Sequence, residues 1–87
     1  MRKQCREILK NWFQGKLIHY RYASYTTQLE MAEKLAMDER SYIDLEHGKT
    51  CCSAVTLALF LTLCSDDPME LLEELRCAIK AVIHDAA

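Results

Sequence analysis

Apolar residues recur at three- and four-residue steps along most of the chain, a spacing typical of helices that bury one face. In the first segment these positions are Cys5, Ile8, Leu9, Trp12, Phe13, Leu17 and Tyr20. Gly15 falls within the pattern, and a glycine costs a helix interior about 1 kcal/mol relative to alanine. The pattern therefore predicts one helix that reaches about Ala23, either continuous or kinked at the glycine.

The next segment predicts a short helix followed by a tight turn. Thr27 with Glu30 three residues later is a capping box, in which the hydroxyl and the carboxylate bond free amides at the helix start. The inward positions of this helix are Leu29, Met31, Ala32 and Leu35. Ala36 and Met37 then form the turn.

A second short helix begins after Asp38, whose carboxylate can cap it. Tyr42 and Leu45, three residues apart, face inward, and Gly48 ends the helix. Two short helices joined by a tight turn form a helix-turn-helix pattern, here residues 27–48. Proteins use this shape to read DNA.

The remainder of the chain predicts two more helices. Ser53 can cap a helix over residues 54–63, whose nearly all-apolar sequence predicts burial at the centre of the domain. Asp67 and Pro68 suit the cap and the first position of a last helix, which runs to about His84. The sequence contains no alternating strand pattern and no internal repeat. We therefore predict an all-α fold of five helices.

Length and composition fit one domain over residues 1–87. Apolar residues make up 51% of the chain, which is enough for a modest single core. No apolar run approaches the length of a membrane span, and no signal peptide is expected. The five cysteines include no Cys-x-x-Cys pair, which indicates reduced thiols in a cytoplasmic protein.

Several residues of the central segment match the pattern of a known family. They are Thr27, Gln28, Ala32, Glu46 and Gly48, with Arg21 six residues before the Thr-Gln pair. Together they resemble the phage-repressor (XRE or Cro-like) helix-turn-helix family over roughly residues 13–65. The resemblance implies a five-helix lambda-repressor-like DNA-binding domain, here with extended first and last helices.

The resemblance also implies that the helix starting at Asp38 lies in the major groove and reads base edges. Its base-reading positions are then Glu39, Arg40 and Asp44. Arg40 can bond guanine O6 and N7 together, and Glu39 can accept a hydrogen bond from cytosine N4. A plain solvated polar face is an equal alternative for Glu39 and Asp44, because their carboxylates weaken the attraction to phosphates.

Contacts with DNA phosphates are expected from Gln28, Ser41, His47, Lys49 and Thr50. As alternatives, Gln28 is an ordinary solvent-facing residue of a first turn, and Lys49 is a plain helix C-terminal cation. The resemblance further implies a structural ion pair between Arg21 and Glu46, which would orient the reading helix.

Charge is distributed unevenly along the chain. The net charge is −2, but residues 1–26 carry six basic residues against a single acidic one. Residues 27–49 carry three basic residues against six acidic ones, so the motif itself is acidic. An electrostatic footprint for DNA must therefore rely on the N-terminal segment.

Two functions fit these patterns. The first is a sequence-specific DNA-binding transcriptional regulator, a repressor that reads a palindromic operator in double-stranded DNA. The second is a helix-turn-helix-fold module for protein interaction, whose acidic recognition face meets a protein partner and does not bind DNA. The motif favours the first function, and the charge favours the second.

The sequence shows no arrangement typical of catalysis or metal binding, so no enzyme activity, cofactor or metal is expected. His47 with Cys51 and Cys52 lacks the paired ligand spacing of a structural zinc site. Cys64 and Cys77 are expected to serve as small buried apolar residues. Cys51 and Cys52 fall in a predicted loop, where a redox response stays open.

The last helix carries more apolar surface than one small core can bury. The extended N-terminal helix, a second subunit, or both would cover the excess. We predict a homodimer formed mainly by residues 69–83, with help from residues 5–13. Its central residues are Leu71, Leu72, Leu75, Ile79, Val82 and Trp12.

Overall fold

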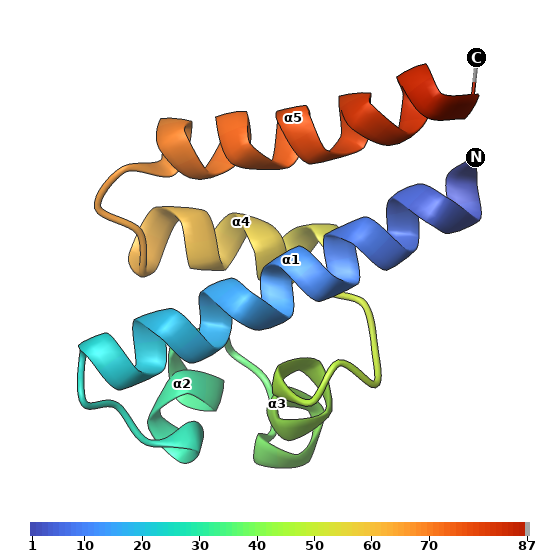
Figure 1. Ribbon diagram of the computed structural model, residues 1–87. Coiled ribbons are helices and arrows are strands. Elements are labelled where there is room, and N and C mark those ends of the chain that lie inside the picture. Colours follow the sequence, from blue (N-terminus) through green and yellow to red (C-terminus); the bar gives the residue numbers. More distant parts are fainter. Residues whose placement is uncertain (87) are drawn as a thin grey trace.

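A computed structural model describes residues 1–86, with side chains described for residues 1–84. The helices are α1 (Arg2–Ala23), α2 (Gln28–Lys34), α3 (Glu39–Glu46), α4 (Ala54–Leu63) and α5 (Pro68–Ala86), shown in Figure 1. No strand occurs within residues 1–86. The expected all-α fold of five helices is confirmed.

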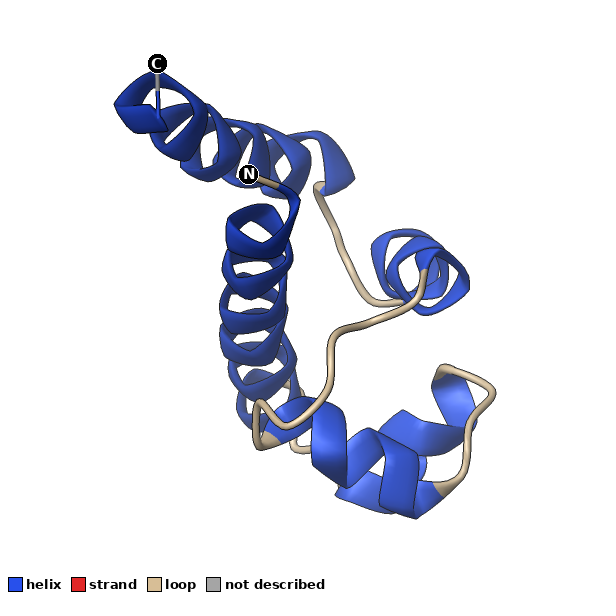
Figure 2. Ribbon diagram, turned by 90° about the vertical axis from the view of Figure 1, so that its right-hand side faces the viewer, coloured by secondary structure: helices blue, strands red, loops and turns tan. Residues whose placement is uncertain are grey.

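The longest helix, α1, is the axis around which the others are arranged. α3 packs against one side of α1 with α2 beside it, and α5 packs against another side of α1 (Figures 1 and 2). α4 lies between α5 and the two short helices in both views. Gly15 leaves α1 continuous, and the start of α1 and the last turn of α5 lie at the same end of the molecule (Figure 1).

The core forms where α1 meets the two short helices and α4. Its buried apolar residues are Phe13, Leu17, Met31, Ala32, Leu35, Tyr42, Leu45, Phe60 and Cys64. The ring of Phe60 packs edge-on against Phe13 and Tyr20, with ring centroids 5.2 and 6.0 Å away. Such edge-to-face pairs stabilise a core beyond the area that they bury. The helix-turn-helix is therefore held to α1 and α4 by one shared core.

One residue of α2 differs from its expected position. Leu29 is 51% exposed, whereas the other predicted inward residues of this helix are buried. The reason is the helical period, because Leu29 is two positions before Met31 in the chain and so lies on the opposite side of the helix. Leu29 therefore belongs to the surface of the motif.

The burial expected for α4 is wrong for most of the helix. Thr56 and Phe60 are buried, but Val55 and Leu63 are 69% and 59% exposed. The sequence of α4 is apolar on every side, so it does not indicate which side packs. Only the side that faces α1 and the motif reaches the core.

The last helix is the least buried of the five. None of its described side chains is buried, and Met69, Leu72 and Ile83 are exposed. Leu71 packs against the core, and the apolar side of the helix faces α1. None of the described helices, α5 included, combines the length and apolarity needed to cross a bilayer.

Candidate nucleic-acid interface

Side-chain caps start both helices of the motif. Thr27 Oγ1 accepts from the Glu30 amide and Glu30 Oε1 accepts from the Thr27 amide, each at 3.1 Å, which completes the predicted capping box. Asp38 accepts from the amide of Ser41 at 3.0 Å and from its hydroxyl at 2.7 Å. These bonds lower the pKa values of Glu30 and Asp38, so both carboxylates stay ionised. Local polar contacts thus determine where α2 and α3 begin.

Left-handed residues end both helices of the motif. Ala36 (φ 55°) follows α2, and Gly48 (φ 74°) follows α3. In each case this residue and the next one donate their amides to carbonyls of the last helical turn, the Schellman pattern. A Cβ on Gly48 would lie 2.7 Å from Oε1 of Gln14, so the glycine is also required by packing against α1.

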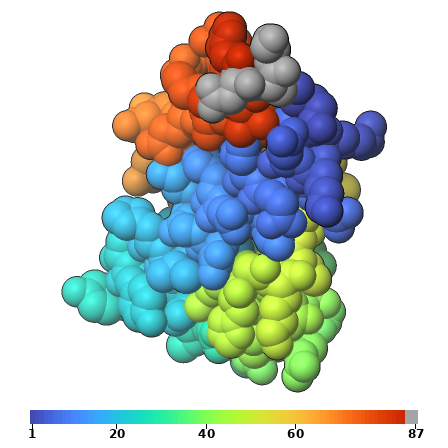
Figure 3. Space-filling view, turned by 45° about the vertical axis from the view of Figure 1, so that its right-hand side comes forward, coloured from blue at the N-terminus to red at the C-terminus, as the bar shows by residue number. Residues whose placement is uncertain are grey.

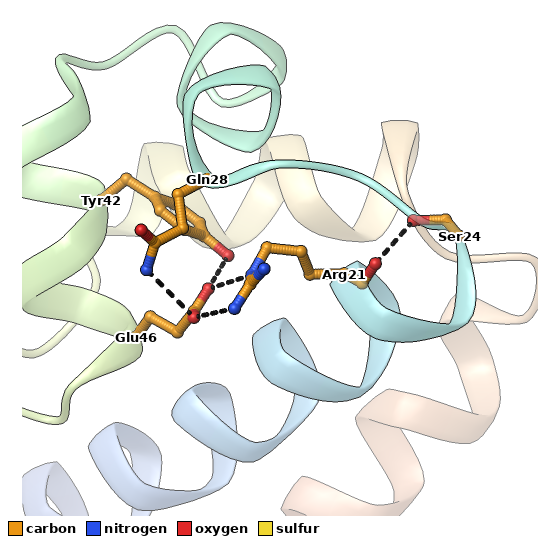
Figure 4. A network of polar contacts seen from close by, with 5 residues as sticks. All are labelled: Arg21, Ser24, Gln28, Tyr42 and Glu46. Carbon is orange, nitrogen blue, oxygen red and sulfur yellow. Dashed lines mark hydrogen bonds and ion pairs between the residues drawn. The ribbon is translucent and has the colours of Figure 1, made fainter.

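The expected ion pair between Arg21 and Glu46 joins α1 to the end of α3. Nε of Arg21 lies 2.8 Å from Oε2 of Glu46, and Nη2 lies 2.6 Å from Oε1 (Figure 4). The Arg21 side chain is 16% exposed and that of Glu46 is 5% exposed. A bidentate, shielded pair of this kind restricts direction as well as distance, so it orients α3 relative to α1.

Two further side chains converge on the same carboxylate. Tyr42 donates its hydroxyl to Oε2 of Glu46 at 2.5 Å, and Gln28 donates Nε2 to Oε1 at 3.3 Å (Figure 4). From the sequence, Tyr42 was expected only in the core, and Gln28 was expected either at a DNA phosphate or facing solvent. The separation of four residues between Tyr42 and Glu46 was the available signal, because residues so spaced share a helix face.

The Glu46 carboxylate is held in its charged form. Burial raises its pKa, but the bonds from Arg21, Tyr42 and Gln28 outweigh burial and lower it. The same contacts act on the partners, because the Glu46 bond raises the pKa of Arg21, and burial with that bond raises the pKa of Tyr42. Three donors from α1, α2 and α3 therefore share one buried anion.

The proposed base-reading residues lie on the outer side of α3. Glu39 is exposed, and Arg40 has 81% of its side chain exposed. Asp44 is 28% exposed, and its Oδ1 lies 3.8 Å from Nε of Arg40. Ile43 is half-buried on the same helix, and the sequence patterns did not single it out. Its apolar side chain is of the kind that contacts a thymine methyl group.

The expected phosphate contacts divide into two groups. His47, Lys49 and Thr50 are exposed just beyond α3, where they can meet a ligand. Gln28 and Ser41 instead use their side chains inside the motif, as a donor to Glu46 and as a donor to the Asp38 cap. The amide of Gln28 therefore faces inward, which differs from the outward position that a phosphate contact needs.

The basic first turns of α1 lie between α5 and the segment that joins α3 to α4 (Figure 1). Figure 3 shows the α1 surface in blue between α5 above and the motif below. The expected reliance of a DNA footprint on residues 1–26 stays a prediction. Arg6 lies beside the segment after α3, where its carbonyl accepts from Sγ of Cys51 at 3.8 Å.

The residues assigned to a dimer interface occupy two environments. Leu71, Leu75, Ile79 and Val82 are half-buried, and Leu72 is exposed at 40%. Trp12 packs partly against the core, and its indole nitrogen is buried with no hydrogen-bond partner among the described residues. The chain thus covers part of this apolar surface itself and leaves part of it open.

The cysteines are reduced, and they differ in burial. Cys64 is buried as expected, but Cys77 is exposed because it lies on the outer side of α5. Cys51 and Cys52 are half-buried, and burial raises the pKa of Cys52 to about 11. Within the described part of the chain, no three His, Cys, Asp or Glu side chains form a group that could hold a metal ion.

Comparisons with known proteins add no assignment to this geometry. No family model matches the chain, and neither a curated protein nor a solved structure matches it. The functional argument therefore depends on the residues and contacts described above.

Proposed function

We propose that the protein is a sequence-specific DNA-binding transcriptional regulator, a repressor that reads double-stranded DNA through α3. The main support for this proposal is the hydrogen bonding of the Glu46 carboxylate. It accepts from Arg21, Gln28 and Tyr42 and so holds α3 against α1 and α2. A helix held in this way presents a fixed outer face, as entry into a major groove requires. This arrangement supports the phage-repressor-like reading of the sequence.

Arg40 is the main candidate for base readout. Its side chain is exposed, and its pairing with Asp44 at 3.8 Å is a surface contact of small energy. The guanidinium can therefore leave Asp44 and bond guanine O6 and N7. Glu39 and Asp44 can accept hydrogen bonds from cytosine N4 while disfavouring other bases at those positions.

Contacts with the phosphates of the DNA backbone would come from the segment that follows α3. His47, Lys49 and Thr50 are exposed there, and Lys49 supplies the positive charge. Each neutralised phosphate releases counterions, so binding would weaken as salt rises. With one cation in this segment, we expect a shallower salt dependence than a basic repressor shows.

A palindromic operator requires two copies of the reading helix. Two-fold pairing places them about 34 Å apart on one face of the duplex. The exposed apolar side chains of α5, Met69, Leu72 and Ile83, are the surface that such pairing would cover.

The test is selection of specific sequences from random duplex DNA, followed by titration of the selected duplex over a range of salt concentrations. Arg40→Ala should cost about 1–3 kcal/mol of binding and relax the base preference at one position. Arg76→Ala is the matched control, because Arg76 is also an exposed arginine paired within its own helix, on α5. No selected sequence at low salt, or equal losses for both variants, would contradict the proposal.

A protein-interaction module is the second candidate, and the charge of the motif favours it. Residues 27–49 contain twice as many acidic residues as basic ones. Under this alternative, the face with Glu39 and Asp44 meets a basic protein surface. If the folded protein binds no DNA duplex at low salt, the result would favour the protein-interaction module over the DNA-binding regulator.

A further inference from the structure

A cavity that opens to the surface lies between α1, α4 and α5. Its volume is about 770 Å³, and the first turns of α1, the segment before α4, the start of α4 and the middle of α5 line it. Leu9, Leu57, Leu75 and Ile79 supply apolar walls from three helices. Cavities of about 300–1,000 Å³ with apolar walls are the usual size for small-molecule ligands.

The polar lining of this cavity is strongly biased toward positive charge. Arg2, Lys3 and Arg6 line it, and no acidic residue does. None of these three cations forms an ion pair with the described side chains of the protein. Within the part of the chain that the structure describes, these exposed cations are therefore available to a ligand.

Helix ends and thiols add to this bias. The first turns of α1 and α4 both border the cavity, and neither turn contains an acidic residue. The positive ends of two helix dipoles therefore meet no compensating carboxylate in those turns. Cys52 also lines the cavity, and because its pKa is raised to about 11, its thiol adds no negative charge at neutral pH.

We propose that this cavity binds an anionic amphiphile, a small molecule with an apolar body and one acidic group such as a carboxylate. The apolar body packs against Leu9, Leu75 and Ile79, and the acidic group meets Arg2, Lys3 and Arg6. Apolar walls with cations on one side select this combination over a cationic or purely polar ligand.

A second copy of the chain is a poorer occupant of this site. A two-fold contact across the cavity would bring the same three cations of each copy together, and like charges placed opposite each other disfavour association. Dimerisation through the exposed side of α5, with Leu72 and Met69, leaves the cavity open. The ligand site and the proposed dimer surface are therefore compatible.

Calorimetric titration with decanoate, below its micelle concentration, tests the site directly. Acetate carries the charge alone, and decyltrimethylammonium carries a similar chain with the opposite charge. We expect decanoate to bind with one molecule per chain and the other two to bind at least tenfold more weakly, roughly the effect of one lost charged hydrogen bond. An affinity for acetate or for decyltrimethylammonium that equals the affinity for decanoate would overturn the proposal.

Variants then locate the site. Arg6→Glu should weaken decanoate binding by at least about tenfold, as should Ile79→Asp, which places a carboxylate on the apolar wall. Lys80→Glu is the matched control. It changes the net charge by the same amount as Arg6→Glu, but Lys80 lies on α5 and does not line the cavity. Thermal unfolding of each variant confirms that it is folded, and Arg6 is exposed, so its replacement leaves the core intact.

Unchanged decanoate binding by a folded Arg6→Glu variant would overturn the assignment. A second pair of results would also overturn it: no decanoate binding by the natural chain, and a dimer that Ile79→Asp dissociates in sedimentation. A second copy of the chain would then fill the cavity. The titration contains no DNA, so its failure is distinct from failure of the proposed DNA-binding function.

Discussion

The helices α3 and α5 are both amphipathic, yet the structure holds them in different ways. The eight-residue α3 buries Tyr42, Leu45 and Glu46, and its carboxylate network ties it to α1 and α2. The nineteen-residue α5 buries none of its described side chains. The shorter helix is thus fixed within the chain, while the longer one keeps apolar surface exposed.

This difference shows which surface each helix can offer. α3 presents polar and charged side chains on a fixed frame, as recognition of a polar ligand requires. α5 presents leucine, methionine and isoleucine, and one of its sides borders the apolar cavity. Exposed apolar surface of this kind marks sites of association. The two helices therefore suit different partners.

Replacement of one leucine in each helix should give the largest contrast. Leu45→Ala, at a site 5% exposed in α3, should lower the free energy of unfolding by about 2–5 kcal/mol because it leaves a cavity in the core. Leu72→Ala, at a site 40% exposed in α5, should change it by less than about 0.5 kcal/mol. Urea unfolding measures both. A cost for Leu72→Ala that grows with protein concentration would show that a second copy buries α5.

Removal of one carboxylate from each helix should give the next largest contrast. Glu46→Ala leaves the shielded Arg21 cation and the Tyr42 hydroxyl without their acceptor, so we expect a loss of about 3 kcal/mol, the lower end for buried pairs. Glu73→Ala on α5 breaks an exposed pair with Arg76 and should cost at most about 1 kcal/mol. Similar losses in chemical denaturation would show that the network does not fix α3.

The same network predicts a dependence on acid. The pKa of Glu46 is lower in the fold than in the unfolded chain, so its pairing stabilises the fold fully above the ordinary glutamate pKa of about 4.3. That stabilisation is lost as pH falls through the folded value. Unfolding measured between pH 7 and pH 3 should therefore show a steeper loss for the natural chain than for Glu46→Gln. Parallel curves would contradict the assigned pKa.

The caps of the two helices should give the smallest contrast. Asp38 and Asp67 each accept a backbone amide from the first turn, at 3.0 and 3.1 Å. Because this contact is local, Asp38→Ala and Asp67→Ala should each reduce hydrogen-exchange protection of their own first turn by about fivefold, the effect of one lost cap. Loss of protection that spreads from Asp67 into α1 would show that α5 is coupled more tightly than its burial indicates.

Sequence patterns predicted most of the fold but only part of the candidate interface. The capping residues Thr27 and Asp38 were identified because their partners lie three residues away in the chain. The Arg21–Glu46 pair came from the family resemblance, since 25 residues separate its members. Gln28 was assigned to phosphate, and nothing in its local sequence indicated that its amide would turn toward Glu46.

The sequence by itself determined the number, limits and caps of the helices, because hydrogen bonds and apolar spacing within a few residues control them. It did not indicate that Tyr25 and Ala36 would adopt positive φ values of 54° and 55°, because neither residue is a glycine. Only the tertiary structure decided which side of α4 is buried, since that helix is apolar all round. It also decided that the cations of residues 2–6 border a cavity shared with α4 and α5, because helix packing sets which distant residues meet.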